Sequence, residues 1–214
     1  TRALARTLSR VMIRTSRSAT GLPFPKREVA IRPFEMTKEE RALYDGVSEF
    51  VREAIEETAN KDFSRWHLLL MVLQKEMGSS AFAATRTLER CQPLFAPTKL
   101  SRRFKRLLEL GHSVTVQSKA EGLIELLAEE GDEKVLVFTQ FRRTLEFLEC
   151  RLGESGHETA IFHGGLSPQA KDRAVGQCRG PTRILLSTEA GGEGRNLQFC
   201  RNVVNYDLPW NPMR

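Results

Sequence analysis

The sequence predicts an α/β protein in which a parallel sheet with flanking helices follows an all-helical subdomain. Beyond about residue 115, short apolar runs such as KVLVF (134–138) and RILLST (183–188) alternate with amphipathic helical patterns. Strands that alternate with helices are typical of parallel sheets, and continuous apolar runs are typical of strands buried on both faces. Residues 37–110, in contrast, carry only the apolar spacing of helices.

Residues 1–36 are predicted to form a basic connector. Its first 35 residues hold eight arginines and lysines but only Glu28 and Glu35, so this stretch carries a charge of +6, as much as the whole chain. Such a concentration of positive charge suits a polyanion such as nucleic acid, although a solvated basic face explains it equally well. The prolines of GLPFPKRE forbid a continuous helix, and residues 29–36 favour a short strand.

Residues 37–114 predict the all-helical subdomain. Thr37 and Glu40 have the spacing of a capping box, in which each side chain accepts a hydrogen bond from the other residue's backbone N–H. Gly78-Ser79-Ser80 interrupts the second apolar stretch, and Ser80 can cap a third helix. The helices after the first are predicted over residues 63–77, from Ser80 until CQPLFAPT (91–98), and over 99–110.

Residues 115–214 are predicted to form the sheet and its flanking helices. Ser167 followed by Pro168 is a strong helix start, because serine caps free N–H groups and proline fits the first turn. Gly153 and Gly156 are expected to end the helix before it. The helices are predicted over 118–130, 142–156 and 167–178, and the strands over 134–138, 159–164, 183–188 and 202–209.

The loops beyond the carboxyl ends of these strands are the candidate site, because ligands of parallel sheets collect there. Four of these loops are polar or rich in glycine: 139–141, 163–165, 187–194 and 205–207. In the third, Gly191, Gly192 and Gly194 let backbone N–H groups approach an anion, and Ser187 and Thr188 add hydroxyl donors. This combination suits the phosphates of a nucleotide or of a nucleic-acid backbone.

Several other kinds of site are not expected. The P-loop pattern G-x-x-x-x-G-K-[ST] is absent from the sequence, so this chain alone should not cradle a triphosphate. The four cysteines form no C-x-x-C pair and have no neighbouring histidine, which favours reduced thiols in a cytosolic protein over a metal site. His163 has no paired serine or cysteine nucleophile, which favours a loop histidine over a catalytic one. No membrane span or secretory signal is expected.

Several stretches resemble one known family. KVLVFTQF, IFHGGLSPQAKDR and RILLSTEAGGEGRNLQFCRNVVNYDLPWNP resemble motifs IV and V and the following segment in the second RecA-like lobe of SWI/SNF-type ATP-dependent DNA translocases, in helicase superfamily two. VMIRTSRSATGLPFPKREV is similar to the family's basic inter-lobe segment, and TKEERALYDGV and LQKEMGSSAFAATRTLER are similar to its helical protrusion in bacterial members. The resemblance implies an inter-lobe connector (1–36), a helical protrusion (37–114) and an incomplete RecA-like lobe (115–214).

The resemblance also implies roles for single residues. Thr188 matches the motif V threonine that contacts a nucleic-acid phosphate, and contacts with DNA are further implied for Thr139, Gln140, Phe141, His163, Gly164, Arg173 and Ser187. The positions that face the bound nucleotide are matched by Gly192, Gly194 and Asn196. Glu193 replaces an arginine of RNA-acting DEAD-box relatives, which favours the SWI/SNF-like branch.

By resemblance, the intact parent hydrolyses ATP with Mg²⁺ and moves along duplex DNA, with RNA polymerase or another nucleoprotein as a further partner. It is expected in the bacterial cytoplasm, at the nucleoid. The P-loop, the acidic Mg²⁺ motif and the motif VI arginines of such motors are missing here, so the chain is expected to be an inactive fragment that ends before motif VI. The alternatives are a non-catalytic module that binds nucleic acid or protein, and an RNA helicase lobe.

Overall fold

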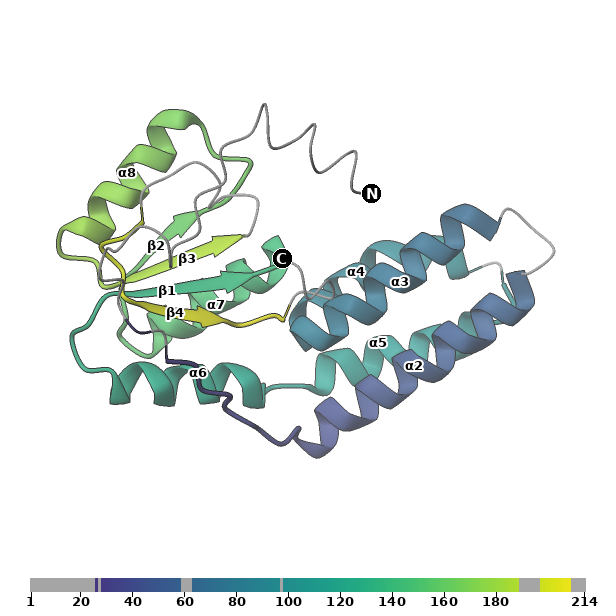
Figure 1. Ribbon diagram of the computed structural model, residues 1–214. Helices are drawn as coiled ribbons and strands as arrows, with labels where there is room; N and C mark the ends of the chain where they lie inside the picture. Colours follow the sequence, from purple (N-terminus) through teal and green to yellow (C-terminus); the bar gives the residue numbers. More distant parts are fainter. Residues whose placement is uncertain (1–25, 27, 59–62, 97, 189–196, 209–214) are drawn as a thin grey trace, which may run out of the picture. The chain divides into compact units, whose positions relative to one another are not determined.

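The computed structural model describes residues 26, 28–58, 63–96, 98–188 and 197–208. Within these residues, four parallel strands form one sheet in the order β2-β3-β1-β4 (Figure 1). The strands are β1 (Val135–Thr139), β2 (Thr159–Phe162), β3 (Ile184–Thr188) and β4 (Asn202–Asn205). The prediction of a parallel α/β sheet is confirmed.

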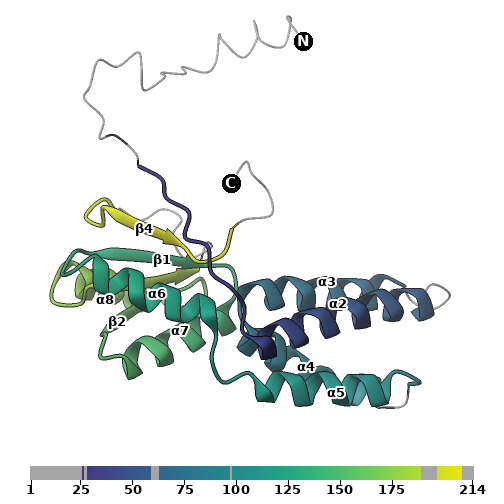
Figure 2. The same cartoon turned by 90° about the horizontal axis from the view of Figure 1, so that it is seen from below.

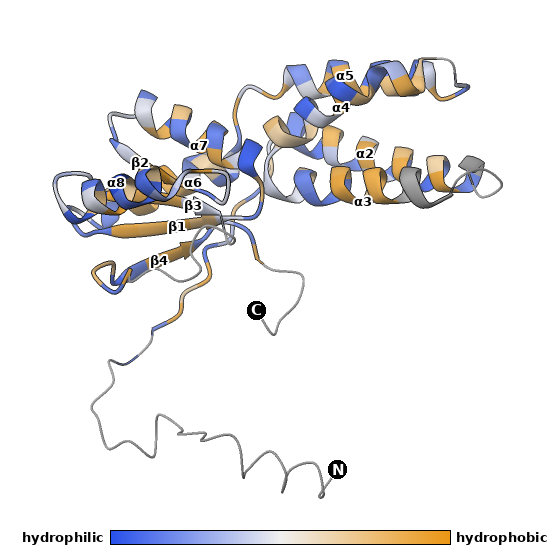
Figure 3. Cartoon of the chain, turned by 90° about the horizontal axis from the view of Figure 1, so that it is seen from above, coloured by the Kyte–Doolittle hydropathy of each residue, from blue (hydrophilic) through white to orange (hydrophobic). Residues whose placement is uncertain are grey.

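Strand β1 is covered on both faces. Its residues Val135 and Val137 pack with helices α6 (Ser118–Glu129) and α7 (Arg142–Glu154). Leu136 packs on the other face, in a cluster that includes Ala174 and Cys178 of α8 (Pro168–Arg179). The strand is apolar along its length (Figure 3), as expected for a strand without a solvent face.

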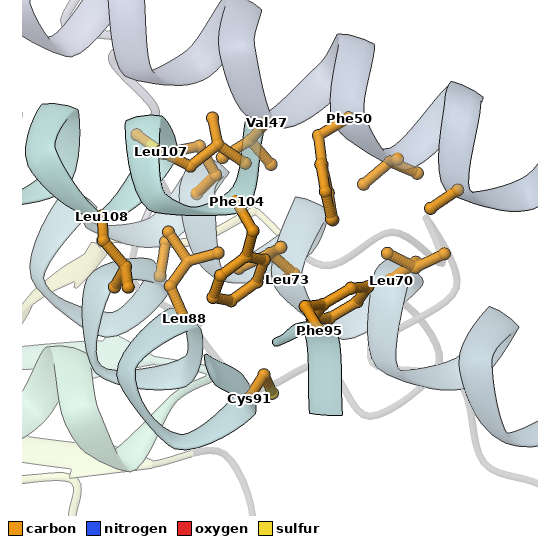
Figure 4. Close-up of a cluster of buried hydrophobic side chains, with 14 of the residues drawn as sticks. Val47, Phe50, Leu70, Leu73, Leu88, Cys91, Phe95, Phe104, Leu107 and Leu108 are labelled. Carbon is orange, nitrogen blue, oxygen red and sulfur yellow. The ribbon is translucent and has the colours of Figure 1, made fainter. Parts of the chain in front are cut away.

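Four helices before the sheet share a separate hydrophobic core. They are α2 (Lys38–Thr58), α3 (Phe63–Ser79), α4 (Ala81–Phe95) and α5 (Ser101–Ser113), and Figure 2 shows them running side by side. Phe50, Phe95 and Phe104 meet in this core, with ring centroids 4.6–5.6 Å apart (Figure 4). Contacts between aromatic rings at such distances add to the stabilisation from burial itself.

The N-terminal caps of three helices agree with the capping patterns predicted from the sequence. The Thr37 N–H donates to Glu40 over 2.8 Å, and the Glu40 N–H donates to the Thr37 hydroxyl over 3.1 Å, which confirms the capping box. Ser80 accepts from the Ala83 N–H over 3.1 Å, and Ser167 accepts from the Ala170 N–H over 3.2 Å. Both predicted serine caps are therefore present.

Other predictions need correction. The strand predicted over 29–36 is wrong: Val29 and Ile31 are 72% and 86% exposed, and the described residues of this stretch have no strand pairing. Helix α4 continues through Pro93 to Phe95, because Phe95 is buried between two other aromatic rings, which offsets the hydrogen bond that proline removes. Gly153 lies inside α7, whereas Gly156, with φ of +80°, follows its end.

Residues Phe34–Arg214 form one compact unit, and the boundaries predicted at residues 36 and 114 stay predictions. Across the described ranges, no helix combines the length and the apolar character that crossing a bilayer requires.

Gly111 is expected to be essential for the contact between α4 and α5. A Cβ at this position would lie 2.5 Å from the Thr85 hydroxyl oxygen, which already donates to the Ala81 carbonyl. Gly111→Ala should therefore lower the free energy of unfolding by about 1–3 kcal/mol. Gly122→Ala is the matched control: it lies in α6 with no atom within 4 Å of its Cβ, and should stabilise by about 0.5–1 kcal/mol. Urea denaturation of both variants measures the difference, and equal stabilities would contradict this packing.

Candidate functional site

The parallel strands bring the predicted loops to one edge of the sheet. Thr139 is the register partner of Thr188, and Phe138 pairs with Ser187 on one side and Asn205 on the other. Phe162, the residue before His163, is also a register partner of Ser187. The carboxyl ends of the four strands therefore lie along one edge of the sheet.

Asp207 is the centre of this edge. It lies just beyond β4, is 9% exposed, and its Oδ2 accepts three hydrogen bonds. The donors are the Ser79 hydroxyl at 2.8 Å, the Thr139 hydroxyl at 2.6 Å and the Gln140 backbone N–H at 2.9 Å. One carboxylate oxygen thus holds the end of β1 and the end of α3 together.

Lys119 supplies the positive charge beside this carboxylate. Its Nζ donates to Asp207 Oδ1 over 2.8 Å and lies 4.2 Å from the centroid of the Tyr206 ring. The tyrosine is buried in the hydrophobic cluster under α6, and this burial, followed by the charges of Asp207 and Glu40, raises the pKa of its hydroxyl. A buried carboxylate with a lysine partner and three further donors meets the usual condition for charge in a protein interior.

Three predicted DNA-contacting residues have defined places in this arrangement. Thr139 is 1% exposed and its hydroxyl is already bonded to Asp207. The Gln140 side chain donates to the Leu208 carbonyl over 3.1 Å. Phe141 is half-buried and precedes the first residue of α7 as its N-cap. These residues shape the loop between β1 and α7, and their contact with DNA stays a prediction.

Ser187 and Thr188 end β3 in the middle of the edge. Both are buried, at 0% and 8% exposure, and the Ser187 hydroxyl donates to the Thr188 carbonyl over 3.0 Å. The nucleotide-facing residues predicted after them, Gly192, Gly194 and Asn196, lie outside the described residues. Their role likewise stays a prediction.

The His163 loop is surrounded by positive charge. The Gly165 N–H donates to His163 Nδ1 over 3.1 Å, and a Cβ on Gly165 would lie 3.8 Å from Nη1 of Arg142. Burial lowers the pKa of His163, and the charges of Arg142 and Lys171 lower it further against the opposing effect of Glu146. The imidazole is therefore neutral near pH 7, with Nδ1 as acceptor and Nε2 left to donate.

The other predicted residues of this region are open to solvent. Gly164 is exposed at the tip of the loop, and Arg173 is exposed on α8. Arg142 and Arg143 are exposed in the first turn of α7, where both form ion pairs with Glu146. Because two arginines share one glutamate, this turn keeps an excess of positive charge.

The described residues offer no place for Mg²⁺ at this edge. Asp207 is the carboxylate found there, and its oxygens already accept from four protein donors, one of them the Lys119 ammonium. In the part of the chain that the structure describes, no group of three or more histidine, cysteine, aspartate or glutamate side chains is placed to hold a metal. The described residues of this edge therefore do not fit a magnesium centre of their own.

Comparison with known proteins agrees with this fold. Residues 118–214 match the helicase conserved C-terminal domain. The uncharacterized ATP-dependent helicase YqhH of Bacillus subtilis (strain 168) is 37% identical over 210 residues, which are 97% of this chain and 36% of that protein. The RNA polymerase-associated protein RapA of Vibrio atlanticus (strain LGP32) is 37% identical over 99 residues, 44% of this chain and 10% of that protein.

Solved structures show the same architecture. The C-terminal part of the Fun30 ATPase domain matches 89% of this chain and 77% of its own chain, with a TM-score of 0.61 and 16% identity. The Sulfolobus solfataricus SWI2/SNF2 ATPase core in complex with dsDNA matches 81% of this chain and 33% of its own, with a TM-score of 0.56 and 20% identity. Residues 118–214 therefore match a helicase C-terminal domain, and the described residues have the fold of SWI2/SNF2-type ATPase C-terminal structures. The chain spans about a third of the length of YqhH and about a tenth of that of RapA.

Sequence reasoning did not identify three residues that meet at this edge: Ser79 of α3, Lys119 of α6 and Asp207 after β4. The loop that contains Asp207 was expected at the edge, but its bond to Ser79 joins residues 128 positions apart. A single sequence has no pattern that signals such a pair. The one usable signal was a carboxylate two residues after β4, a position where burial demands partners.

Asp207→Asn should destabilise the helicase lobe by about 2–4 kcal/mol. The amide keeps the shape of the side chain but removes the negative charge that four donors require. Urea denaturation of the whole chain measures the loss. Asp45→Asn, on the exposed face of α2, is the matched control and should stay within about 0.5 kcal/mol of wild type. Equal effects of the two substitutions would contradict the role of Asp207.

Arg142→Met should raise the pKa of His163, since it removes a nearby positive charge. The folded-state pKa of His163 lies below the ordinary value of 6.5. The neutral histidine therefore contributes stability above pH 6.5, and this contribution is lost as the pH falls from 6.5 through the lower folded-state pKa. An NMR titration of the His163 imidazole measures its pKa in the wild type and in Arg142→Met. Arg86→Met, on α4, should leave the pKa of His163 unchanged. An unchanged pKa in Arg142→Met would show that the guanidinium does not face this loop.

Proposed function

We propose that this lobe belongs to an ATP-dependent DNA translocase and that its sheet edge grips the backbone of duplex DNA. The observation that carries the proposal is the register of the strands, which makes Thr139, His163 and Thr188 neighbours at one edge. Helices α7 and α8 also begin at this edge, directly after β1 and the His163 loop. Helix N-termini favour anions, because their free N–H groups and the helix dipole both face the ligand.

The charges around the His163 loop support a polyanionic ligand. Arg142 and Arg143 are exposed on the first turn of α7, and Arg173 is exposed on the second turn of α8. His163, which lies near Arg142, offers a neutral N–H donor. Contacts of this kind neutralise phosphates without reading bases, as a translocating protein requires. The dsDNA complex of the Sulfolobus SWI2/SNF2 core makes duplex DNA the first ligand to test.

ATP use is proposed for the protein that contains both lobes. YqhH is described as ATP-dependent, yet this chain has no P-loop and no described Mg²⁺ ligand. We therefore expect this lobe to add only accessory contacts to the nucleotide, through Gly192, Gly194 and Asn196, in a cleft completed by a first lobe. The chain alone should not hydrolyse ATP.

The partners and location follow from the same proposal. RapA is named for its association with RNA polymerase, so an RNA polymerase or another nucleoprotein on DNA is a reasonable second partner. The site of action would then be the bacterial cytoplasm, at the nucleoid. A non-catalytic module that binds nucleic acid or protein is the second candidate, favoured by the absence of a P-loop pattern from this sequence.

In the full-length protein, Thr188→Ala should weaken the stimulation of ATPase activity by duplex DNA. Loss of one hydroxyl–phosphate hydrogen bond costs about 1 kcal/mol, so the DNA concentration for half-maximal stimulation should rise about fivefold. Thr182→Ala is the matched control, since Thr182 is equally buried just before β3, at the opposite end of the strand.

Three outcomes would contradict the proposal in different ways. A wild-type protein without ATPase activity would favour the non-catalytic module. Stimulation by RNA rather than by duplex DNA would favour an RNA helicase lobe. A normal response of Thr188→Ala would remove Thr188 from the DNA contact.

A further inference from the structure

The junction between α3 and α4 contacts both flanks of the loop formed by residues 139–141. On one flank, the Ser79 hydroxyl and the Thr139 hydroxyl donate to the same oxygen of Asp207. On the other flank, the hydroxyls of Ser79 and Ser80 lie 2.7 and 2.9 Å from the Thr144 hydroxyl, in the first turn of α7. The loop is therefore held between two contacts to one junction of the helical group.

Lys119 adds a third contact between the same two parts. Its Nζ lies 3.2 Å from the Gly78 carbonyl and 3.5 Å from the Ser79 carbonyl, at the C-terminal end of α3, where the helix dipole favours a cation. The same Nζ donates to Asp207, and the two side chains are only 17% and 7% exposed. Separating a buried ion pair is costly because it leaves an uncompensated charge, so this contact ties Lys119 to Asp207.

We propose that Ser79, Lys119 and Asp207 form a coupling element, in which the position of the α3–α4 junction sets the position of the 139–141 loop. This inference rests on the proposed function, because it concerns how that edge of the sheet meets DNA. Ser79 and Lys119 are positioning residues: they act on the loop through Asp207 and Thr144. A displacement of α3 and α4 is thereby converted into a change of grip on the DNA backbone.

Two variants test the coupling in the full-length protein. Ser79→Ala removes one bridge, while Asp207 keeps its bonds from Thr139 and Gln140 and Ser80 keeps Thr144. Lys119→Met removes the charge but keeps an unbranched chain over the Tyr206 ring. In both, the duplex-DNA concentration for half-maximal ATPase stimulation should rise about fivefold to tenfold, with the DNA-free ATPase rate unchanged.

Matched controls separate coupling from simple loss of stability. Ser48→Ala removes a hydroxyl that donates to the Tyr44 carbonyl within α2, and Arg151→Met removes a cation paired with Glu121 and Glu154. Both should respond to DNA as wild type does. Ser79→Thr and Lys119→Arg keep the hydroxyl and the charge, and should restore the wild-type response. A purely structural role would instead lower the melting temperature and the DNA-free rate together.

The result also distinguishes this inference from the proposed function. The proposed function stands if DNA stimulates the wild type and Thr188→Ala weakens that response. If Ser79→Ala and Lys119→Met then respond to DNA as the wild type does, the coupling is overturned. If DNA does not stimulate the wild type, the proposed function falls, and the coupling falls with it.

Discussion

The burial of strand β1 on both faces is the constraint from which the rest of the lobe follows. β1 lies between β3 and β4, and both neighbours run parallel to it. Parallel neighbours need crossover connections, and here α7 and α8 cover opposite faces of the sheet. Each crossover helix begins near the carboxyl end of the strand before it. Polar loops and helix N-termini therefore gather at one edge as a consequence of how the core is covered.

The helical group and the sheet meet through polar contacts as well as apolar ones. Phe82 of α4 stacks on Phe147 of α7, with centroids 5.6 Å apart. In addition, the Asp207 carboxylate accepts from donors of both parts, and Glu40 at the start of α2 accepts from the Ser118 N–H at the start of α6. Buried polar groups of this kind tolerate few alternative arrangements, because an unpaired one is costly. The contact is therefore specific in geometry, which apolar packing alone does not ensure.

The sequence was informative wherever the cause of a structure is local. The Thr37–Glu40 box and the Ser80 cap depend on residues three positions apart, and KVLVF has the continuous apolar run that is typical of a strand covered on both faces. The helix predicted to end at CQPLFAPT continues through Pro93, because the burial of Phe95 outweighs the low helix propensity of proline. The strand expected over 29–36 failed since alternating apolar residues make a strand only when a neighbouring strand pairs with them. The hydrogen bonds of Asp207 could not be predicted, because its partners come from three segments that are distant in the sequence.

The burial of Thr139 bears on where the affinity for DNA would come from. Its hydroxyl already donates to a carboxylate, so a transfer of that bond to a phosphate exchanges one anionic acceptor for another. Such an exchange contributes little net free energy, since bonds are lost and gained in equal number. Under the proposed function, more of the affinity would then come from groups that face solvent with positive charge, such as Arg142, Arg173 and the N-termini of α7 and α8. In this view the Thr139 hydroxyl fixes the shape of the edge, while the cations near the His163 loop and the Thr188 hydroxyl are the groups proposed to bind the backbone.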